Sequence, residues 1–128
     1  PASQDPSGPV HREKNYQINW DHVMDEFRGA TAVCIGGTWY DAGFGQLQPD
    51  TWYHLVGTYD GESLKAYKNG VLVAENSDPS GAPDHEEQSL KLGRHARDDN
   101  YFRGTIDEVR IYNYALTGAD VATLASGQ

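Results

Sequence analysis

The chain has 128 residues, which suits one domain large enough to bury a core of its own. Ten Lys and Arg residues against 19 Asp and Glu residues give a net charge of −9, and such acidity repels nucleic acid and anionic membranes. With 14 glycines, 6 prolines and 8 tyrosines, the composition favours strands and tight turns, so an all-β domain is expected. The lone Cys34 excludes an intramolecular disulfide.

Residues 1–15 carry three prolines among small and charged residues and have no apolar period, which predicts a flexible arm or linker. The domain itself is expected over residues 16–128. The chain shows no apolar run long enough for a signal peptide or a membrane span. We therefore expect a processed chain or a fragment of a longer protein.

The first half of the domain is predicted to contain three strands. Residues 16–20 and 27–35 alternate between apolar and polar side chains, as half-buried strands do, and one helical turn or a loop is expected between them. The glycine-rich residues 36–45 predict a broad turn or a short irregular strand pair. Residues 52–59 lie between two turn signals and predict a central strand.

A β-hairpin over residues 64–75 is the clearest local prediction. Asn69 and Gly70 separate two alternating runs, and this dipeptide is preferred in two-residue turns in which both residues have positive φ. The polar, Pro- and Gly-rich residues 77–87 then predict a loop before a short strand at residues 89–93.

The closing strand is predicted at residues 102–116, where it contains an acidic residue on its apolar side. Asp107 shares a face with Val109 and Ile111 if the segment is extended, and a buried carboxylate needs a compensating partner. After this strand, Thr117 is expected to cap a short helix that runs through about Ala125. The apolar residues of that helix are expected to pack on the sheets.

Four blocks of sequence carry a family resemblance: T-W-Y-H-L-V-G-T-Y-D-G, L-K-A-Y-K-N-G, L-K-L-G-R and F-R-G-T-I-D-E-V-R-I-Y-N-Y-A-L-T. In this order they resemble the second half of a laminin-G-like domain of the concanavalin A-like superfamily, from residue 51 to about residue 125. The resemblance implies a jelly-roll sandwich of two curved antiparallel sheets.

The chain departs from the family at its beginning. Family members carry further strands before the equivalent of residue 16, including an F-D-G segment and a W-V strand, which this chain lacks. The departure implies a truncated sandwich. Either the arm and first strands replace the missing edge, or another chain or a second copy in a homodimer supplies it, or the chain is a fragment whose exposed edge invites pairing; a fragment or completion by a partner is favoured.

In relatives, the carboxylate that corresponds to Asp107 binds a structural calcium ion together with oxygens from the early strands. The resemblance therefore implies that Asp107 is a calcium ligand. Two other interpretations stay open. Asp107 accepts backbone N–H groups at the start of the strand, or a bulge at Ile106 and Asp107 turns the carboxylate outward.

No catalytic site is predicted. The glucanase pattern E-x-D-x-x-E is absent, and the sequence contains no G-x-S-x-G or H-E-x-x-H motif. Two acidic pairs, Asp84 with Glu86 and Asp98 with Asp99, lie in predicted loops and are expected to be solvated. We therefore expect a protein that is not an enzyme.

A carbohydrate-binding site needs exposed aromatic rings and a few polar groups, because sugars present apolar faces together with hydroxyls. Trp39 and Tyr40 are candidates, although packing of Trp39 over the neighbouring glycines is an equal alternative. The last long loop offers further candidates, which are Arg94, His95, Asp98, Asn100 and Tyr101. Tyr101 also suits a structural place before the closing strand. By contrast, Trp52, Tyr59 and Tyr67 are expected in or near the core.

The sequence predicts a non-catalytic binding or adhesion module of a larger secreted or cell-surface protein, with carbohydrate as the expected ligand. The alternative is a structural or protein-interaction domain that association completes. A degenerate glycoside hydrolase or lyase is the third interpretation. Neither nucleic acid nor membrane insertion is expected.

Overall fold

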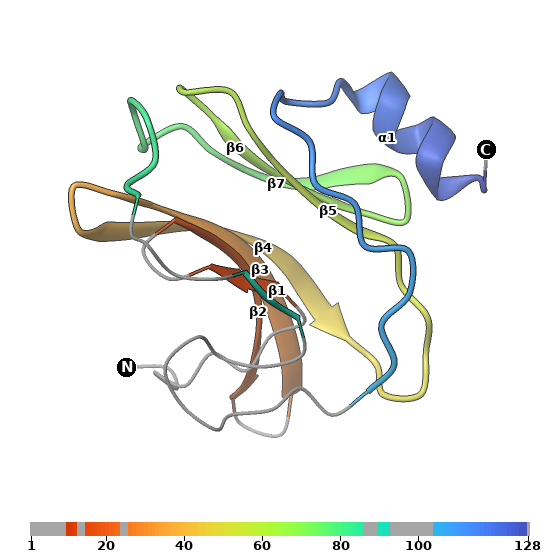
Figure 1. The fold of residues 1–128 in the computed structure, drawn as a ribbon. Coiled ribbons are helices and arrows are strands. Elements are labelled where there is room, and N and C mark those ends of the chain that lie inside the picture. The colour runs from red at the N-terminus through yellow and green to blue at the C-terminus, as the bar shows by residue number, and fades with distance from the viewer. Residues whose placement is uncertain (1–9, 13–14, 24–25, 86–89, 93–103, 128) are drawn as a thin grey trace.

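The computed structural model describes residues 10–12, 15–23, 26–85, 90–92 and 104–127. Two antiparallel sheets face each other, and one helix lies beside the smaller sheet near the C-terminus (Figure 1). The strand order is β4-β3-β2-β1-β8 in the larger sheet and β5-β6-β7 in the smaller one. The prediction of an all-β sandwich with a short C-terminal helix is confirmed.

The larger sheet consists of β1 (Val10–Arg12), β2 (Tyr16–Val23), β3 (Glu26–Ile35), β4 (Thr38–Leu47) and β8 (Lys91–Leu92). β1 lies inside the segment that we expected to be an arm, and it pairs with both β2 and β8. The prediction of a helical turn or a loop between the first two strands is wrong for most of the residues between them. β2 and β3 continue as a paired ladder to Val23 and Glu26.

The glycine-rich segment after β3 forms a tight hairpin. Gly36 and Gly37 have φ values of 59° and 80°, a left-handed conformation that glycine adopts at little cost. The strand that follows, β4, is ten residues long and pairs with β3 from Phe27–Leu47 to Ile35–Thr38, with one irregularity after Gly29. The irregular strand pair predicted here is therefore a long, mostly regular hairpin.

The smaller sheet consists of β5 (Leu55–Tyr59), β6 (Leu64–Lys68) and β7 (Val71–Asn76). Asn69 and Gly70 have φ values of 53° and 83°, so the predicted two-residue turn is confirmed. The expectation that the segment at residues 52–59 is a central strand is wrong, because β5 is the edge of its sheet. Within the described chain, β5 pairs with β6 alone.

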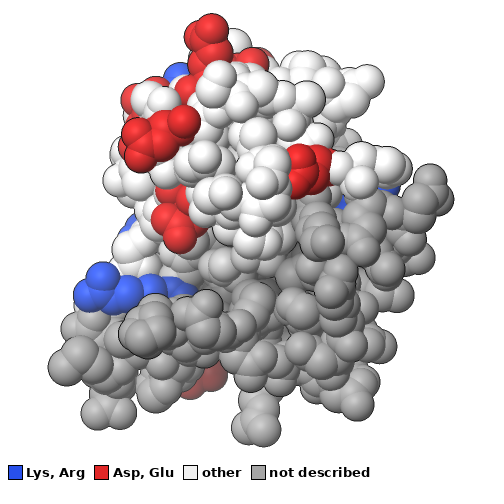
Figure 2. All heavy atoms as spheres, turned by 90° about the vertical axis from the view of Figure 1, so that its left-hand side faces the viewer, with Lys and Arg blue, Asp and Glu red and all other residues white. Residues whose placement is uncertain are grey.

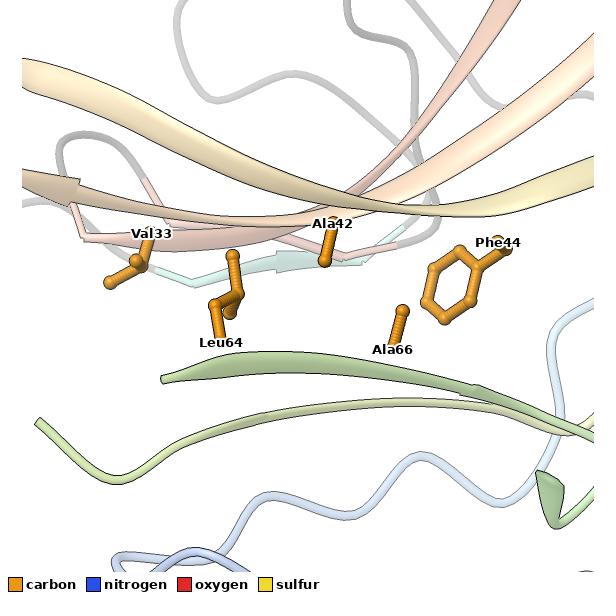
Figure 3. Packing of buried hydrophobic residues seen from close by; sticks show 5 residues of the cluster. All are labelled: Val33, Ala42, Phe44, Leu64 and Ala66. Atoms are coloured by element: carbon orange, nitrogen blue, oxygen red, sulfur yellow. The ribbon is translucent and has the colours of Figure 1, made fainter. Parts of the chain in front are cut away.

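The core lies between the two sheets. Val33 and Ala42 of the larger sheet face Leu64 and Ala66 of β6, and the ring of Phe44 fills the space beside them (Figure 3). All five are at most 4% exposed. Complete burial of side chains of this size contributes roughly 1.5–3 kcal/mol for each large one, so this cluster holds the sheets together.

The closing strand predicted at residues 102–116 is wrong over its described part, residues 104–116, which forms no strand. Glu108 has a φ of 54°, a left-handed conformation that interrupts an extended chain. Asp107 is exposed rather than buried, and so are Val109 and Ile111. The segment crosses in front of β5 before the helix begins (Figure 1).

The helix α1 (Gly118–Ala125) begins and ends where the sequence predicted. The Thr117 side chain accepts the backbone N–H of Asp120, and the Asp120 carboxylate accepts the N–H of Thr117, which forms a complete capping box. Val121 is completely buried. In the part of the chain that the structure describes, no helix has the length and apolar character needed to cross a membrane.

Candidate functional site

A cleft of about 870 Å³ opens between the sheets on the side of β5. Its walls come from β2 and β3 of the larger sheet, from β5 of the smaller sheet, and from residues 105–116. Ligand-binding pockets typically have volumes of about 300–1,000 Å³, so the cleft has the size of a binding site.

The outer wall of the cleft consists of residues 105–116, which belong to no strand. Residues 105–116 form no backbone-to-backbone hydrogen bond with any other described part of the chain. Four of their large side chains are exposed to between 38% and 62%, namely Val109, Ile111, Tyr112 and Tyr114. The rings of Tyr112 and Tyr114 lie edge to face, with centroids 5.7 Å apart. This wall offers apolar contact area together with unused backbone donors and acceptors.

Two polar side chains that line the cleft lack hydrogen-bond partners within the described structure. In Gln17 of β2 the buried atom without a partner is Oε1. In His54, which lies just before β5, it is Nδ1. A buried polar atom without a partner costs about 1–3 kcal/mol. A ligand that supplied hydrogen bonds to these atoms would recover that free energy.

The inner end of the cleft contains Tyr59, whose hydroxyl donates a hydrogen bond to the carbonyl oxygen of Gly81. Burial, followed by the neighbouring negative charge of Asp60, raises the pKa of the Tyr59 phenol. The Asp60 carboxylate accepts the backbone N–H groups of Glu62 and Ser63, and these bonds lower the pKa of Asp60. The turn after β5 is thus fixed by an acidic side chain.

The raised pKa of Tyr59 predicts a loss of stability in alkali. The folded state holds the phenol proton more tightly than the unfolded state does, so the stabilisation is complete below the ordinary pKa of about 10 and is lost as the pH rises through the folded pKa. In Tyr59→Phe, the free energy of unfolding should fall less steeply between about pH 9 and about pH 11. Urea denaturation at both pH values checks this, and equal slopes in the two proteins would contradict it.

Trp39 and Tyr40, the predicted aromatic pair, lie next to each other on β4 and not in the cleft. Trp39 is 38% exposed, whereas Tyr40 is half-buried and packs against the core cluster. Adjacent residues of a strand point to opposite faces, so the two rings do not form one flat surface. Trp39 is therefore the exposed member of the pair.

The other predicted ligand-binding residues, Arg94, His95, Asp98, Asn100 and Tyr101, lie outside the described residues. Asp107, the predicted metal ligand, lines the cleft. Its Oδ1 atom accepts the backbone N–H of Glu108 at 2.8 Å. This bond resembles the backbone alternative that the sequence left open, although it forms in an exposed loop and not at the start of a strand.

The described surroundings of Asp107 do not fit a calcium ion. Calcium takes six to eight oxygen ligands, whereas among the described residues no group of three or more His, Cys, Asp or Glu side chains comes together. The family resemblance predicts a calcium ion at Asp107, whereas the described geometry predicts none.

Thermal melting in calcium and in chelator checks that prediction. The geometry around Asp107 leads us to expect equal melting temperatures in the two solutions. An ion present at 100 times its Kd would stabilise the fold by about 2.7 kcal/mol, and its removal would lower the melting temperature by roughly 5–10 °C. A drop of that size in the wild type, absent in Asp107→Asn, would instead establish Asp107 as a calcium ligand.

Asp84 has a structural role that the sequence did not reveal. Its two carboxylate oxygens accept the backbone N–H groups of Gly36 and Gly37, at 2.8 and 2.7 Å. Its own N–H donates to the carbonyl oxygen of Cys34, whose side chain is buried as expected of a small apolar strand residue. Asp84 thus fastens the loop after β7 to the β3–β4 hairpin and is not merely a solvated loop residue.

Among the three aromatic residues expected in or near the core, Tyr67 is 5% exposed and Tyr59 packs against the core cluster. The expectation is wrong for Trp52, which is 66% exposed and lines the cleft. The sequence interpretation also missed Gln17 and His54 as cleft residues. Only the alternating aromatic residues of I-Y-N-Y gave a local signal for this site, and they suggested a packed strand.

The family model of the concanavalin A-like lectin/glucanases superfamily, in its laminin G form, matches residues 10–122. The chain belongs to this superfamily. The laminin-G-like resemblance of the sequence is therefore confirmed, and the match includes β1 through most of α1.

Two curated relatives are the mouse and human pappalysin-1 proteins. Each is 34% identical to this chain, over 79 residues in mouse and 77 in human. These regions cover 59% and 57% of this chain, and in each case only 5% of the relative. This chain therefore matches one small part of a much longer protein in both species.

A solved structure with a similar fold is that of an S-layer domain-containing protein, residues 221–444, from Clostridium thermocellum. It superimposes with a TM-score of 0.47 and 21% sequence identity, and the match covers 90% of this chain and 65% of that one.

Proposed function

We propose that this domain is a non-catalytic binding module of a larger secreted or cell-surface protein, and that it recognises another polypeptide through the cleft beside β5. One observation carries the proposal. The extended residues 105–116 have no backbone partner in the described chain, and they expose large apolar side chains at the mouth of a cleft of about 870 Å³.

Such a surface is suited to association. Monomeric proteins rarely leave a contiguous group of large apolar side chains in water, and unpaired strand edges are natural templates for another chain. The membership of a superfamily that includes lectins, and the partial likeness to pappalysin-1, support a binding role outside the cell.

Amide hydrogen exchange in dilute solution tests the proposal. We expect the amides of residues 106–114 to exchange quickly, because nothing in the described chain pairs with them, while those of β3 and β6 in the core exchange slowly. Slow exchange at residues 106–114 in a monomer, whose mass is checked by light scattering, would mean that the chain closes the cleft itself. That result would overturn the proposal.

Carbohydrate is a second candidate ligand, favoured by the partly exposed ring of Trp39 next to the Gly36–Gly37 turn. A net charge of −9 disfavours anionic glycans, so a neutral oligosaccharide is the suitable probe. Titration should quench tryptophan fluorescence in the wild type and in Trp52→Ala, but not in Trp39→Ala. A response that survives Trp39→Ala would move the sugar site elsewhere, and no response to a panel of neutral oligosaccharides would remove this candidate.

A further inference from the structure

We infer that the cleft accepts a β-strand, and that its ligand is an extended segment with apolar residues at alternate positions and Lys or Arg between them. The inference rests on the proposed function, because it specifies the polypeptide that the cleft would bind. Three features of the cleft support it: the unpaired backbone groups, the buried polar atoms without hydrogen-bond partners, and the charged side chains. Each restricts the chemistry of the ligand independently.

The backbone groups favour a strand. The edge strand β5 and residues 105–116 both line the cleft, and in the described structure neither uses its free backbone groups in hydrogen bonds to another segment. An extended segment between them would form a ladder with β5, and with residues 105–116 as a second partner. A helix satisfies its own backbone groups and would leave both edges unpaired.

The polar atoms of the cleft require a ligand that brings hydrogen bonds into its interior. Gln17 is only 8% exposed, and its Oε1 atom has no donor among the described residues. A ligand that carries a hydrogen-bond donor into the cleft can pair with this oxygen, whereas a purely apolar ligand cannot. His54 Nδ1 offers a second unused position at the same wall.

The charges of the cleft favour a cationic ligand over a second copy of this chain. Asp107, Glu108 and Arg110 line the outer wall, and Arg110 lies 3.5 Å from Glu108, which leaves Asp107 without a described basic partner. The whole chain carries a net charge of −9, so two copies repel each other. Acidic side chains also lie on another face of the domain, which is the left-hand side of Figure 1 as seen in Figure 2. Lys and Arg at the outward positions of the ligand would complement this field.

Residues 105–116 would have to change conformation at Glu108 to pair with a ligand strand. The φ of 54° at Glu108 interrupts the extended run in the unbound domain, and this conformation costs a residue with a side chain about 1–2 kcal/mol relative to an extended one. Pairing with a ligand strand requires a regular ladder, so Glu108 would leave the left-handed region when the ligand binds. Substitutions that change only the preference for positive φ should therefore change the affinity.

The test uses the 128-residue chain and the eight-residue peptide (Val-Lys)₄. We expect this peptide to bind, and to slow amide exchange both at residues 106–114 and in β5. Two control peptides separate the contributions. (Val-Glu)₄ reverses the charge, and an N-methylated (Val-Lys)₄ removes alternate amide donors. Each control should bind at least about tenfold more weakly, because four lost hydrogen bonds or a repulsive field weaken the complex.

The matched variants Glu108→Val and Glu108→Gly both remove the charge but differ in backbone preference. Valine strongly disfavours positive φ, whereas glycine tolerates it. Glu108→Val should therefore bind (Val-Lys)₄ about tenfold more tightly than Glu108→Gly does. Equal affinities would mean that residues 105–116 do not become a strand on binding, and would overturn the inference.

Failure of the inference can be told apart from failure of the proposed function. If residues 106–114 exchange quickly but neither (Val-Lys)₄ nor its controls bind, or if the N-methylated peptide binds equally well, the cleft is open but does not accept a strand. If light scattering shows a dimer in which these amides become protected, the occupant is a second copy and the inference of a cationic ligand is wrong.

Discussion

Gly57→Ala should destabilise the domain by about 3 kcal/mol, because β5 approaches β3 closely at this position. A Cβ atom at residue 57 would lie 2.6 Å from the Cβ of Thr31 and closer still to its hydroxyl oxygen. Thr31 is 5% exposed, so it has little room to move away. Urea denaturation of the wild type and the variant measures the loss as a lower midpoint at unchanged slope.

Gly43→Ala is the matched control for this prediction. Gly43 also lies in a strand, β4, but a Cβ atom there would have its nearest neighbours at 3.9 and 4.0 Å, which is ordinary contact. The free energy of unfolding of Gly43→Ala should stay within about 1 kcal/mol of the wild-type value. The Thr31→Gly background should reduce the cost of Gly57→Ala. A cost for Gly57→Ala similar to that for Gly43→Ala would mean that the sheets are not in close contact at this point.

Asp84→Ala should cost about 2 kcal/mol of stability. Each of its carboxylate oxygens accepts one backbone N–H of the β3–β4 turn, and hydrogen bonds to a charged group contribute roughly 1.5–3 kcal/mol when buried. Both glycine amides are exposed, so water compensates for part of the loss and the expected cost lies below the roughly 3–6 kcal/mol of two such bonds. Thermal or urea denaturation measures the effect.

Asp84→Asn is the control variant. It removes the negative charge and one acceptor oxygen but keeps a side chain of the same size in the loop. An asparagine keeps one acceptor oxygen, so it can bind one of the two amides and should lose about half as much stability as the alanine variant. Amide exchange should show faster opening at Gly36 and Gly37 in both variants. If Asp84→Ala melts like the wild type, the carboxylate does not hold the hairpin in solution.

The sequence predicted those parts of the fold that depend on local chemistry. The Asn69-Gly70 turn, the capping box at Thr117 and the period-2 patterns of β2 and β3 each need only a few neighbouring residues to be recognised. The family resemblance then supplied the two-layer arrangement, because it extends from residue 51 to about residue 125 and so includes the smaller sheet and the helix.

The errors arose where the structure depends on residues distant in sequence. Residues 102–116 have the pattern of a strand, but a strand also needs a neighbour, and the described residues 104–116 have none. For the same reason β5 appeared central and Trp52 appeared buried. In the described part of the chain no strand lies next to β5 on its outer side, and Trp52 is 66% exposed.

The candidate site was even less predictable than the fold. The cleft is a gap between segments that are up to about a hundred residues apart in the sequence, so no local pattern marks Gln17 or His54 as neighbours of Asp107. Likewise, the pairing of Asp84 with Gly36 and Gly37 connects residues 48 and 47 positions apart. Periodicity and turn signals describe each segment separately and contain no information on such distances.

The position of Asp84 in the chain has a consequence for synthesis at the ribosome. The β3–β4 hairpin emerges first, but the carboxylate that holds its turn follows 47 residues later, and β8, which pairs with β1, follows later still. A nascent chain grows at about 5–20 residues per second, so several seconds pass between synthesis of the hairpin and synthesis of Asp84. During that interval the apolar face of the hairpin is accessible to chaperones and to neighbouring nascent chains. Aggregation is therefore most probable while only the first half of the domain has been synthesised.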